Sequence, residues 1–583
     1  MCGIVGYVGN KQNATWLIDI LKKLEYRGYD SAGLSVNVSR GLKVIKTVGE
    51  IDALHKTLPQ KLLIRNAIAH TRWATHGKPS VLNAHPHKSY RGKWAIVHNG
   101  IIENCELLKR KLEMPVSGET DTEVLVQYIE ENCLQADIEN FIKAFKEVSG
   151  SYAVACQAKE EKNKLFLAKN KSPLYVAIGK TGALVASDPI CFCGFADKYY
   201  EMPDNSFAVM TASSVNFYNE NCLKIFVPIY EIDDFECDTD KGKYPHYMIK
   251  EILEQPQALI RQVAGYRDTK CLSGFDCNFI KKYQNVVLIG SGTAYHAAMI
   301  GKTFFEEILK MPAFCVVASE FTLNKPEVSI GETLFVIVSQ SGETADALSA
   351  QKQILKQKGQ VIAVTNVSTS TLAKNASFVL PIFAGREIAV ASTKAYVCQV
   401  SALYLLARHL EEKLVDKAYE EIEEVANSIL KFDKKIIDEL AIKLQTSKFV
   451  MFIGKNQDFI TAKESALKLQ EITYIPALSV YSGELKHGYL ALVDHKTYVF
   501  AIATTQDNYM AVKNAVHEVT ARGGKVVMVS HIDNSEIKLS KACKFLMPII
   551  SVAPMQYLAY RLSVIKKLNP DKPRNLAKSV TVV

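Results

Sequence analysis

The chain has 583 residues and a formal net charge of +9, and 48% of its residues are hydrophobic while 22% are charged. This composition is typical of globular proteins, and the length indicates about three or four domains, so a single small module and a disordered chain are excluded. The basic residues form no Lys-rich or Arg-rich block, and no stretch holds the roughly 18 apolar residues of a membrane span. We therefore expect neither a nucleic-acid partner nor a membrane association.

Two further features of the sequence bear on location and on metals. The N-terminus lacks the basic region of a secretory signal, which indicates a cytoplasmic protein. The thirteen cysteines include no C-x-x-C pair, so we expect no metal site.

The first part of the chain consists of short β-branched runs separated by turn residues, such as 94–97 and 152–156. This pattern predicts antiparallel sheets with a few helices. A polar, acidic stretch at 233–244 is typical of a linker. We accordingly place a first domain at residues 2–222 and a linker with a connecting helix at 223–276.

In the second part, continuous apolar runs alternate with helical stretches, which predicts parallel sheets covered by helices. The run at 287–290 recurs at 451–454, and the run at 333–337 recurs at 497–501, both 164 residues later (451 − 287 and 497 − 333). A constant offset indicates a duplicated α/β domain. We place the two copies at 277–417 and 441–574 and a C-terminal tail at 575–583.

Cys2 directly follows the initiator methionine. Removal of Met1 would place its thiol beside a free α-amine, whose pKa of about 7.7 to 8.0 suits a base that activates a nucleophile. An accidental second residue is the simpler explanation of this position alone. Other residues favour chemistry, because Arg72 can clamp a carboxylate and Asp121 can pair with an ammonium. Asn99 and Gly100 can supply the two donors of an oxyanion hole.

Several motifs of this region together are similar to a known family. M-C-G-I-V-G at the N-terminus, H-T-R-W-A-T-H-G at 70–77 and H-N-G-I-I-E-N at 98–104 resemble the N-terminal-nucleophile glutaminase domain of class II glutamine amidotransferases. The resemblance implies that Cys2 attacks the side-chain amide of glutamine and that Asn99 and Gly100 stabilise the oxyanion. It also implies that Trp73 gates the passage of ammonia, and that glutamine is held by Arg72, Thr75, His76 and Asp121.

The sequence S-Q-S-G-E-T, residues 339–344, lies between an apolar strand and a helix that we expect to start near Thr344. Hydroxyls, a flexible glycine and a helix N-terminus form a loop suited to a phosphate monoester. An ordinary helix cap would explain one serine but not the whole cluster. The corresponding segment of the second copy, 503–508, has no glycine and an added carboxylate, so only the first copy is expected to bind phosphate.

Glu464, Lys468 and Glu471 follow the spacing i, i+4, i+7, which places them on one face of a helix. By itself this spacing favours a solvated ion pair. However, G-E-L-K-H-G at 483–488 and R-N-L-A-K-S at 574–579 resemble, together with S-Q-S-G-E-T, the sugar isomerase (SIS) domains of the glucosamine-6-phosphate synthase family. The resemblance now covers essentially the whole chain.

The resemblance implies a fold and a reaction. The fold is an α+β N-terminal-nucleophile glutaminase, an αββα sandwich, followed by two α/β doubly wound parallel-sheet SIS domains. The reaction converts fructose 6-phosphate and glutamine to glucosamine 6-phosphate and glutamate without a cofactor, in a homodimer formed through the SIS domains. Alternatives are an amidotransferase that acts on another keto-sugar phosphate and a sugar-phosphate-sensing protein.

The resemblance also assigns roles in the sugar site. Lys578 forms an imine with the ketose, Glu471 transfers a proton, His487 assists ring opening, and Lys468 supports developing charge beside Glu464. The residues implied to bind the sugar phosphate are Thr293, Ser339, Gln340, Ser341, Thr344, Val390 and Ser392. The chain departs from the family at Ala294, where serine is common, and at Tyr489, which follows the H-G of the His487 motif.

Overall fold

The computed structural model describes residues 2–39, 41–73, 77–232, 240–275, 277–321, 323, 326–411, 415–532 and 535–579. The chain divides into two compact units between residues 239 and 240. Among the described residues, no helix combines the length and the apolar character that a membrane crossing requires.

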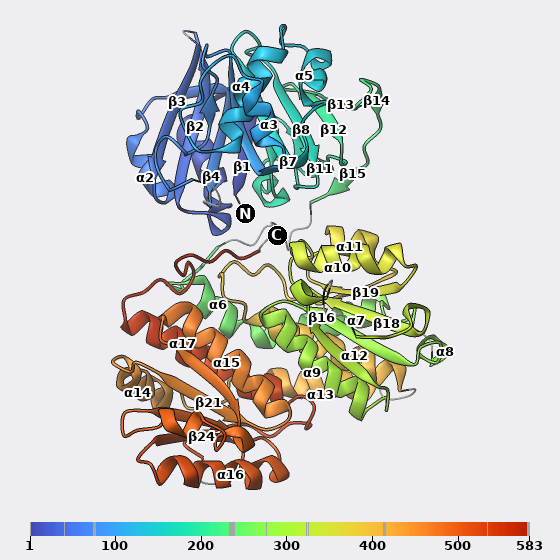
Figure 1. Ribbon diagram of the computed structural model, residues 1–583, viewed down its shortest axis with the longest axis vertical. Helices are drawn as coiled ribbons and strands as arrows, with labels where there is room; N and C mark the ends of the chain where they lie inside the picture. Colours follow the sequence, from blue (N-terminus) through green and yellow to red (C-terminus); the bar gives the residue numbers. More distant parts are fainter. Residues whose placement is uncertain are drawn as a thin grey trace. The chain divides into compact units, whose positions relative to one another are not determined.

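The first unit, blue to green in Figure 1, contains two antiparallel sheets. In spatial order the eight-stranded sheet consists of β15 (Ile229–Glu231), β11 (Lys198–Glu201), β9 (Tyr175–Gly179), β10 (Gly182–Ala186), β1 (Gly3–Asn13), β4 (Leu63–Arg72), β2 (Ser31–Val38) and β3 (Gly41–Val48). The seven-stranded sheet consists of β14 (Lys224–Ile225), β13 (Val215–Asn219), β12 (Ser206–Met210), β8 (Leu165–Asn170), β7 (Gly150–Ala158), β6 (Trp94–Ile102) and β5 (His87–Lys88). The helices are α1 (Ala14–Lys22), α2 (Ile51–Thr57), α3 (Cys105–Arg110), α4 (Asp121–Asn132) and α5 (Ile138–Phe145).

Three apolar clusters show how these elements form layers. Side chains such as Leu17 of α1 pack on one face of the first sheet. Side chains such as Ile68 and Val97 fill the space between the two sheets. Phe141 of α5 and its neighbours cover the outer face of the second sheet. The result is the expected αββα sandwich, because each sheet buries both faces.

The second unit, green to red in Figure 1, contains two parallel five-stranded sheets. The first consists of β17 (Ala313–Val317), β16 (Asn285–Gly290), β18 (Thr333–Val338), β19 (Gln360–Thr365) and β20 (Phe378–Pro381). The second consists of β22 (Ala477–Tyr481), β21 (Val450–Gly454), β23 (Tyr498–Ile502), β24 (Lys525–Ser530) and β25 (Ile537–Lys538). The helices are α6 (Tyr247–Leu253), α7 (Gln255–Thr269), α8 (Cys277–Ile280), α9 (Thr293–Glu307), α10 (Ala345–Lys356), α11 (Thr371–Asn375), α12 (Lys394–Leu410), α13 (Val415–Ser428), α14 (Lys434–Leu444), α15 (Gln457–Thr473), α16 (Gln506–Thr520) and α17 (Met547–Ile565).

The two sheets of this unit are copies of one another. Their strands follow the same spatial order, and the helix after the first strand begins at equivalent positions, α9 at Thr293 and α15 at Gln457. The preceding residues share an unusual backbone, with φ 54° and ψ −126° at Gly292 and φ 52° and ψ −127° at Asn456. The duplication predicted from the 164-residue offset is therefore confirmed, together with the fold class.

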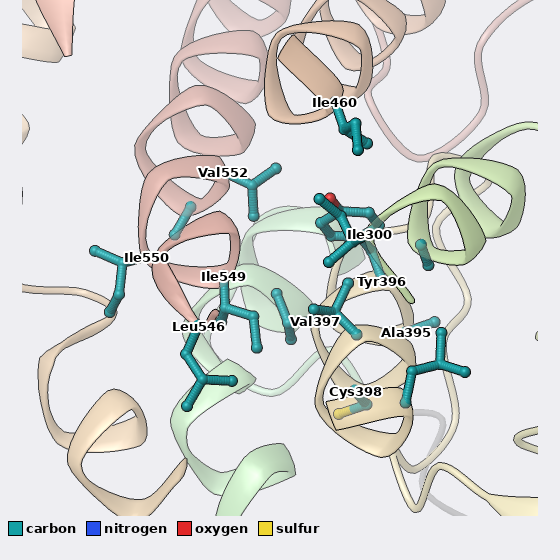
Figure 2. Close-up of a cluster of buried hydrophobic side chains, with 14 of the residues drawn as sticks. Ile300, Ala395, Tyr396, Val397, Cys398, Ile460, Leu546, Ile549, Ile550 and Val552 are labelled. Atoms are coloured by element: carbon teal, nitrogen blue, oxygen red, sulfur yellow. The ribbon is translucent and has the colours of Figure 1, made fainter. Parts of the chain in front are cut away.

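One apolar core joins the two copies. Figure 2 shows Ile300 of α9, Tyr396 of α12, Ile460 of α15 and Val552 of α17 gathered in this cluster of buried side chains. Burial of each such side chain contributes roughly 1.5 to 3 kcal/mol. Because α9 packs directly on α15, residues of the two copies meet across this helix pair.

Candidate functional site

The first candidate site surrounds Cys2, immediately before β1. Because β1 and β4 are antiparallel neighbours, Trp73 at the end of β4 lies beside Cys2, and its backbone N–H donates a hydrogen bond to Sγ at 3.3 Å. Burial raises the pKa of the Cys2 thiol, although Trp73 and Arg72 oppose the increase. The thiol is therefore protonated at rest, and a base must remove its proton before it can attack.

Asn99 of β6 holds its side-chain amide in one orientation. Its Nδ2 donates to the carbonyl of Cys2 at 2.9 Å, and its Oδ1 lies 3.0 Å from Nε2 of His70. The same Nε2 lies 3.2 Å from the carbonyl oxygen of His98. Since the oxygens of Asn99 and His98 are acceptors, Nε2 of His70 must carry the proton, and Nδ1 of His85 is its third neighbour at 3.3 Å. This arrangement directs the amide nitrogen of Asn99 toward Cys2.

Four buried imidazoles form a cluster behind Asn99, namely His70, His85, His87 and His98. The rings of His70 and His85 have centroids 4.3 Å apart, and those of His85 and His87 are 4.9 Å apart. Burial lowers the pKa of all four, that of His70 to about 3. The cluster is therefore neutral at physiological pH.

The other residues expected at this site lie on adjoining elements. A Cβ at Gly100, whose φ is +130°, would lie 1.9 Å from the carbonyl oxygen of Ser151, so only glycine fits beside Asn99. Arg72 is buried and donates from Nη2 to the carbonyl oxygen of Gly77 at 3.3 Å. Asp121 begins α4 and accepts from the N–H of Ile102 at 2.8 Å. Thr75 and His76 lie outside the described residues.

The second candidate site includes one face of α15. Lys468 is fully buried, and its Nζ lies 2.7 Å from Glu471 and 3.5 Å from Glu464. Burial alone would lower the pKa of Lys468, but the two carboxylates more than compensate and raise it. Thr293, at the start of α9, donates to Glu464 at 3.1 Å and accepts from Lys468 at 3.0 Å. Residues of both SIS copies thus form one network.

Lys578 reaches a second buried carboxylate, that of Glu387. The pair is fully enclosed, and Nζ of Lys578 also lies 3.2 Å from Oγ of Ser392. Although burial favours the protonated carboxyl, Lys578 and the backbone N–H groups of Thr393 and Ala395 hold the pKa of Glu387 at about 2. Glu387 is therefore the counter-ion that keeps the tail lysine in place.

The loop 339–344 joins β18 to α10 and has Thr344 as the N-terminal cap position of α10. Oγ of Ser339 lies 3.1 Å from Oγ1 of Thr344 and accepts from the N–H of Gly342 at 3.1 Å. Gly342 has φ +63°, and a Cβ there would lie 2.0 Å from Oγ of Ser370. The loop therefore curves back on itself with its hydroxyls together, and Gln340 and Ser341 lie within it.

Two expected residues have other surroundings. The N–H of Val390 donates to the carbonyl oxygen of Asp571 at 3.0 Å, which ties the Val390 loop to the chain that leads to Lys578. His487 is exposed, and none of the residues that the structure describes forms a hydrogen bond or an ion pair with its ring. The structure does not bring His487 into the Lys468 network.

Sequence reasoning did not find three residues of these sites: Glu387, His70 and His296. His296 lies three residues after Thr293 on α9, and its Nδ1 is 2.7 Å from Glu464. That i+3 spacing on the same helix face was an available signal. Glu387 stands in the charged start of the segment that contains Val390 and Ser392, but nothing local connects it with Lys578.

Comparisons with known proteins identify the family of both parts of the chain. The SIS domain family matches residues 279–408 and 443–566, and the glutamine amidotransferase domain family matches residues 70–193. The isomerizing glutamine–fructose-6-phosphate aminotransferases of Bacillus cereus and Bacillus subtilis are each 39% identical to this chain, with 100% of both chains covered. The chain belongs to the family of isomerizing glutamine–fructose-6-phosphate aminotransferases.

A solved structure supports the same assignment for the second unit. The C-terminal domain of the glucosamine-fructose-6-phosphate aminotransferase from Francisella tularensis is 33% identical, with a TM-score of 0.54. The match covers 57% of this chain and 100% of that domain. The family resemblance predicted from the sequence motifs is therefore confirmed.

Proposed function

We propose that this aminotransferase converts fructose 6-phosphate and glutamine to glucosamine 6-phosphate and glutamate. The observation that carries the proposal is that one chain holds both a Cys2 site with an oriented Asn99 and a buried lysine–carboxylate network that includes Lys578. Full-length relatives with this reaction in their names support it.

In the glutaminase half, the α-amine freed by removal of Met1 takes the proton of the Cys2 thiol. The thiolate attacks the side-chain amide of glutamine, and the oxyanion receives hydrogen bonds from Asn99 and Gly100. The amine returns the proton to the leaving nitrogen, so ammonia departs and a thioester remains. Water then releases glutamate. Glutamine itself is held by Arg72, Thr75, His76 and Asp121.

In the sugar half, the ring of fructose 6-phosphate opens with the help of His487. Lys578 forms an imine at C2, and ammonia displaces it to give the amino-sugar imine. Glu471 moves a proton from C1 to C2, which yields the aldose, while Lys468 and Glu464 stabilise the developing charge. The phosphate and sugar are held by Thr293, Ser339, Gln340, Ser341, Thr344, Val390 and Ser392.

We further propose a cytoplasmic homodimer formed through the SIS domains. Support comes from the exposed side chains of Tyr481, Tyr489 and Leu492 near one another in sequence, since exposed apolar groups often mark interfaces. The mass of the purified protein in solution tests this assembly.

An isotope experiment tests the reaction. Glutamine labelled with ¹⁵N at the side-chain amide is supplied with fructose 6-phosphate, and the products are identified by mass spectrometry. We expect one labelled glucosamine 6-phosphate for each glutamate. A panel of other keto-sugar phosphates serves as the comparison, and faster labelling of another acceptor would favour a different substrate. Binding of sugar phosphate without any turnover would favour a sensor.

A further inference from the structure

The two SIS copies place different side chains at the same position. This position is the second residue of the helix after the first strand, Ala294 on α9 and Asp458 on α15. The preceding glycines confirm the equivalence. A Cβ at Gly290 would lie 2.8 Å from the carbonyl carbon of Ala294, and a Cβ at Gly454 would lie 2.5 Å from that of Asp458.

Asp458 reaches the loop that corresponds to the phosphate loop. Its Oδ2 accepts from the backbone N–H of Thr504 at 2.9 Å and from Nδ2 of Asn508 at 2.7 Å. Its Oδ1 accepts from Oγ1 of Thr504 at 2.5 Å. At the same offset, Thr504 corresponds to Gln340 and Asn508 to Thr344. The carboxylate of Asp458 in the second copy therefore occupies the position that faces the phosphate loop in the first copy.

The environment of Asp458 is that of a bound anion. The residue is fully buried, and no described lysine or arginine forms an ion pair with it. Burial raises the pKa of its carboxyl to about 6, although the hydrogen bonds from Thr504 and Asn508 oppose the increase. Neutral donors alone hold the charge, which is also how a loop and a helix N-terminus hold phosphate.

The two loops also differ in length. Six residues, 339–344, separate β18 from α10, whereas three residues, 503–505, separate β23 from α16. The helix α16 begins at Gln506, the position that corresponds to Gly342 with its φ of +63°. The second loop is thus closed around Asp458 and has no turn of its own for a phosphate.

We propose that the residue at this helix position decides which SIS copy binds the sugar phosphate. In the second copy, the carboxylate of Asp458 takes the place where a phosphate would bind. In the first copy, Ala294 leaves that place open for the phosphate of the sugar. The inference rests on the proposed function and specifies its site: one fructose 6-phosphate binds per chain. Asp458 also ties the first turn of α15 to Thr504, and the same helix presents Glu464, Lys468 and Glu471 to the sugar site.

The first test places a carboxylate at position 294 of the first copy. Fructose 6-phosphate binding is measured by calorimetry for the wild type, Ala294→Asp and the uncharged control Ala294→Asn. We expect one site per chain in the wild type and an affinity at least about 30-fold weaker in Ala294→Asp, because two like charges would share one cradle. Ala294→Asn should lose less than about fivefold, because it adds volume and a hydrogen-bonding group without charge.

The outcomes of this test are distinct. Wild-type affinity in Ala294→Asp, with an unchanged melting temperature, overturns the inference and leaves the proposed function standing. A wild type that does not bind fructose 6-phosphate overturns the proposed function itself. Two sites per wild-type chain contradict a closed second copy.

The second test removes the carboxylate of Asp458 from the second copy and uses inorganic phosphate as the probe. The melting temperatures of Ala294→Asp and of the double variant Ala294→Asp with Asp458→Ala are followed as phosphate is added, with sodium chloride of equal ionic strength as the control. Only the double variant should be stabilised by phosphate, because an anion can then enter the vacated position. An equal response of the two proteins overturns the role of Asp458 as an internal anion.

Discussion

The two candidate active sites of this aminotransferase differ in the polar groups that they bury. Around Cys2, apart from the cationic Arg72, the buried groups are the neutral amide of Asn99 and four imidazoles whose pKa values are lowered by burial. Around Lys468 and Lys578 the buried groups form ion pairs: Lys468 pairs with Glu464 and Glu471, and Lys578 pairs with Glu387. The difference teaches what each reaction requires of its surroundings.

Amide hydrolysis develops charge only transiently, on the oxyanion. Donors that are fixed in advance stabilise this charge without reorganisation, and in the proposed mechanism a neutral His70 that holds Asn99 would serve that purpose. Isomerisation moves a proton between carbon atoms, so the sugar site needs carboxylates and lysines in defined protonation states. Although burial opposes it, the pairing with Glu471 and Glu464 raises the pKa of Lys468 and keeps its ammonium charged inside the protein.

The largest effect is expected when Cys2, the proposed nucleophile, is replaced. Cys2→Ala should abolish glutamine hydrolysis, because alanine has no thiol to form the proposed thioester. Synthesis driven by added ammonium salts should continue, since the sugar site is intact. Measurement of glutamate and glucosamine 6-phosphate in parallel decides the matter, and near wild-type glutamine hydrolysis would exclude Cys2 as the nucleophile.

The matching change in the sugar site removes a counter-ion. Glu387→Gln leaves Lys578 buried without its carboxylate, and breaking a buried pair costs about 3 to 5 kcal/mol. We expect ammonia-dependent synthesis to fall at least about 150-fold, the factor that corresponds to the lower end of this range. Glutaminase activity of the same protein is the internal control and should not change. Synthesis within a factor of about three of wild type would show that Glu387 does not support Lys578.

The fold and the local motifs were accessible from the sequence because they depend on neighbouring residues. The 164-residue repeat and the helical face of Glu464 and Lys468 are visible as regular spacings. Glu387 and Lys578 are 191 residues apart, and only the packing of the tail against the second unit brings them together. Likewise, no pattern around His70 indicates that its ring orients Asn99 from a neighbouring sheet.

A smaller loss is expected when the sugar site loses one neutral donor. Thr344→Ala removes a hydroxyl from the phosphate loop, where a hydrogen bond to a charged acceptor contributes roughly 1.5 to 3 kcal/mol. The affinity for fructose 6-phosphate should therefore fall by about 10-fold to 150-fold. Thr344→Ser retains the hydroxyl and should bind within about threefold of wild type. Equal affinities of Thr344→Ala and the wild type would place the phosphate elsewhere.

We propose that the two sites are coupled, because ammonia formed at Cys2 loses its nucleophilicity when it becomes ammonium in water. Trp73 binds Cys2 through its backbone and directly follows Arg72, so its indole is suited to respond to glutamine. Trp73→Ala should keep glutamine hydrolysis but form severalfold less glucosamine 6-phosphate per glutamate. Trp73→Phe is the conservative control and should stay nearer to one-to-one coupling. Unchanged coupling in the alanine variant would remove Trp73 from the gate.

The smallest effect is expected for Glu251, and it tests whether this buried carboxyl of the sugar half is ionised. Burial, together with the nearby charge of Glu387, raises the pKa of Glu251 to about 8. The folded protein therefore keeps this carboxyl protonated at pH values where the unfolded chain, with a pKa near the usual 4.5, has already lost the proton.

Because the folded-state pKa is the higher one, the stability that this group contributes is present below about pH 4.5 and is lost as the pH rises through about 8. Glu251→Gln keeps an acceptor for the N–H groups of Ile388 and Ala389 and removes the titration. The unfolding free energy of the variant relative to wild type should rise from pH 5 to pH 8, by at most about 1.4 kcal/mol per pH unit. Melting temperatures of the two proteins, measured across this pH range, follow the rise. Above pH 8 the difference should level off. If the stability difference between the variant and wild type is instead constant from pH 5 upward, Glu251 is already ionised in the folded protein.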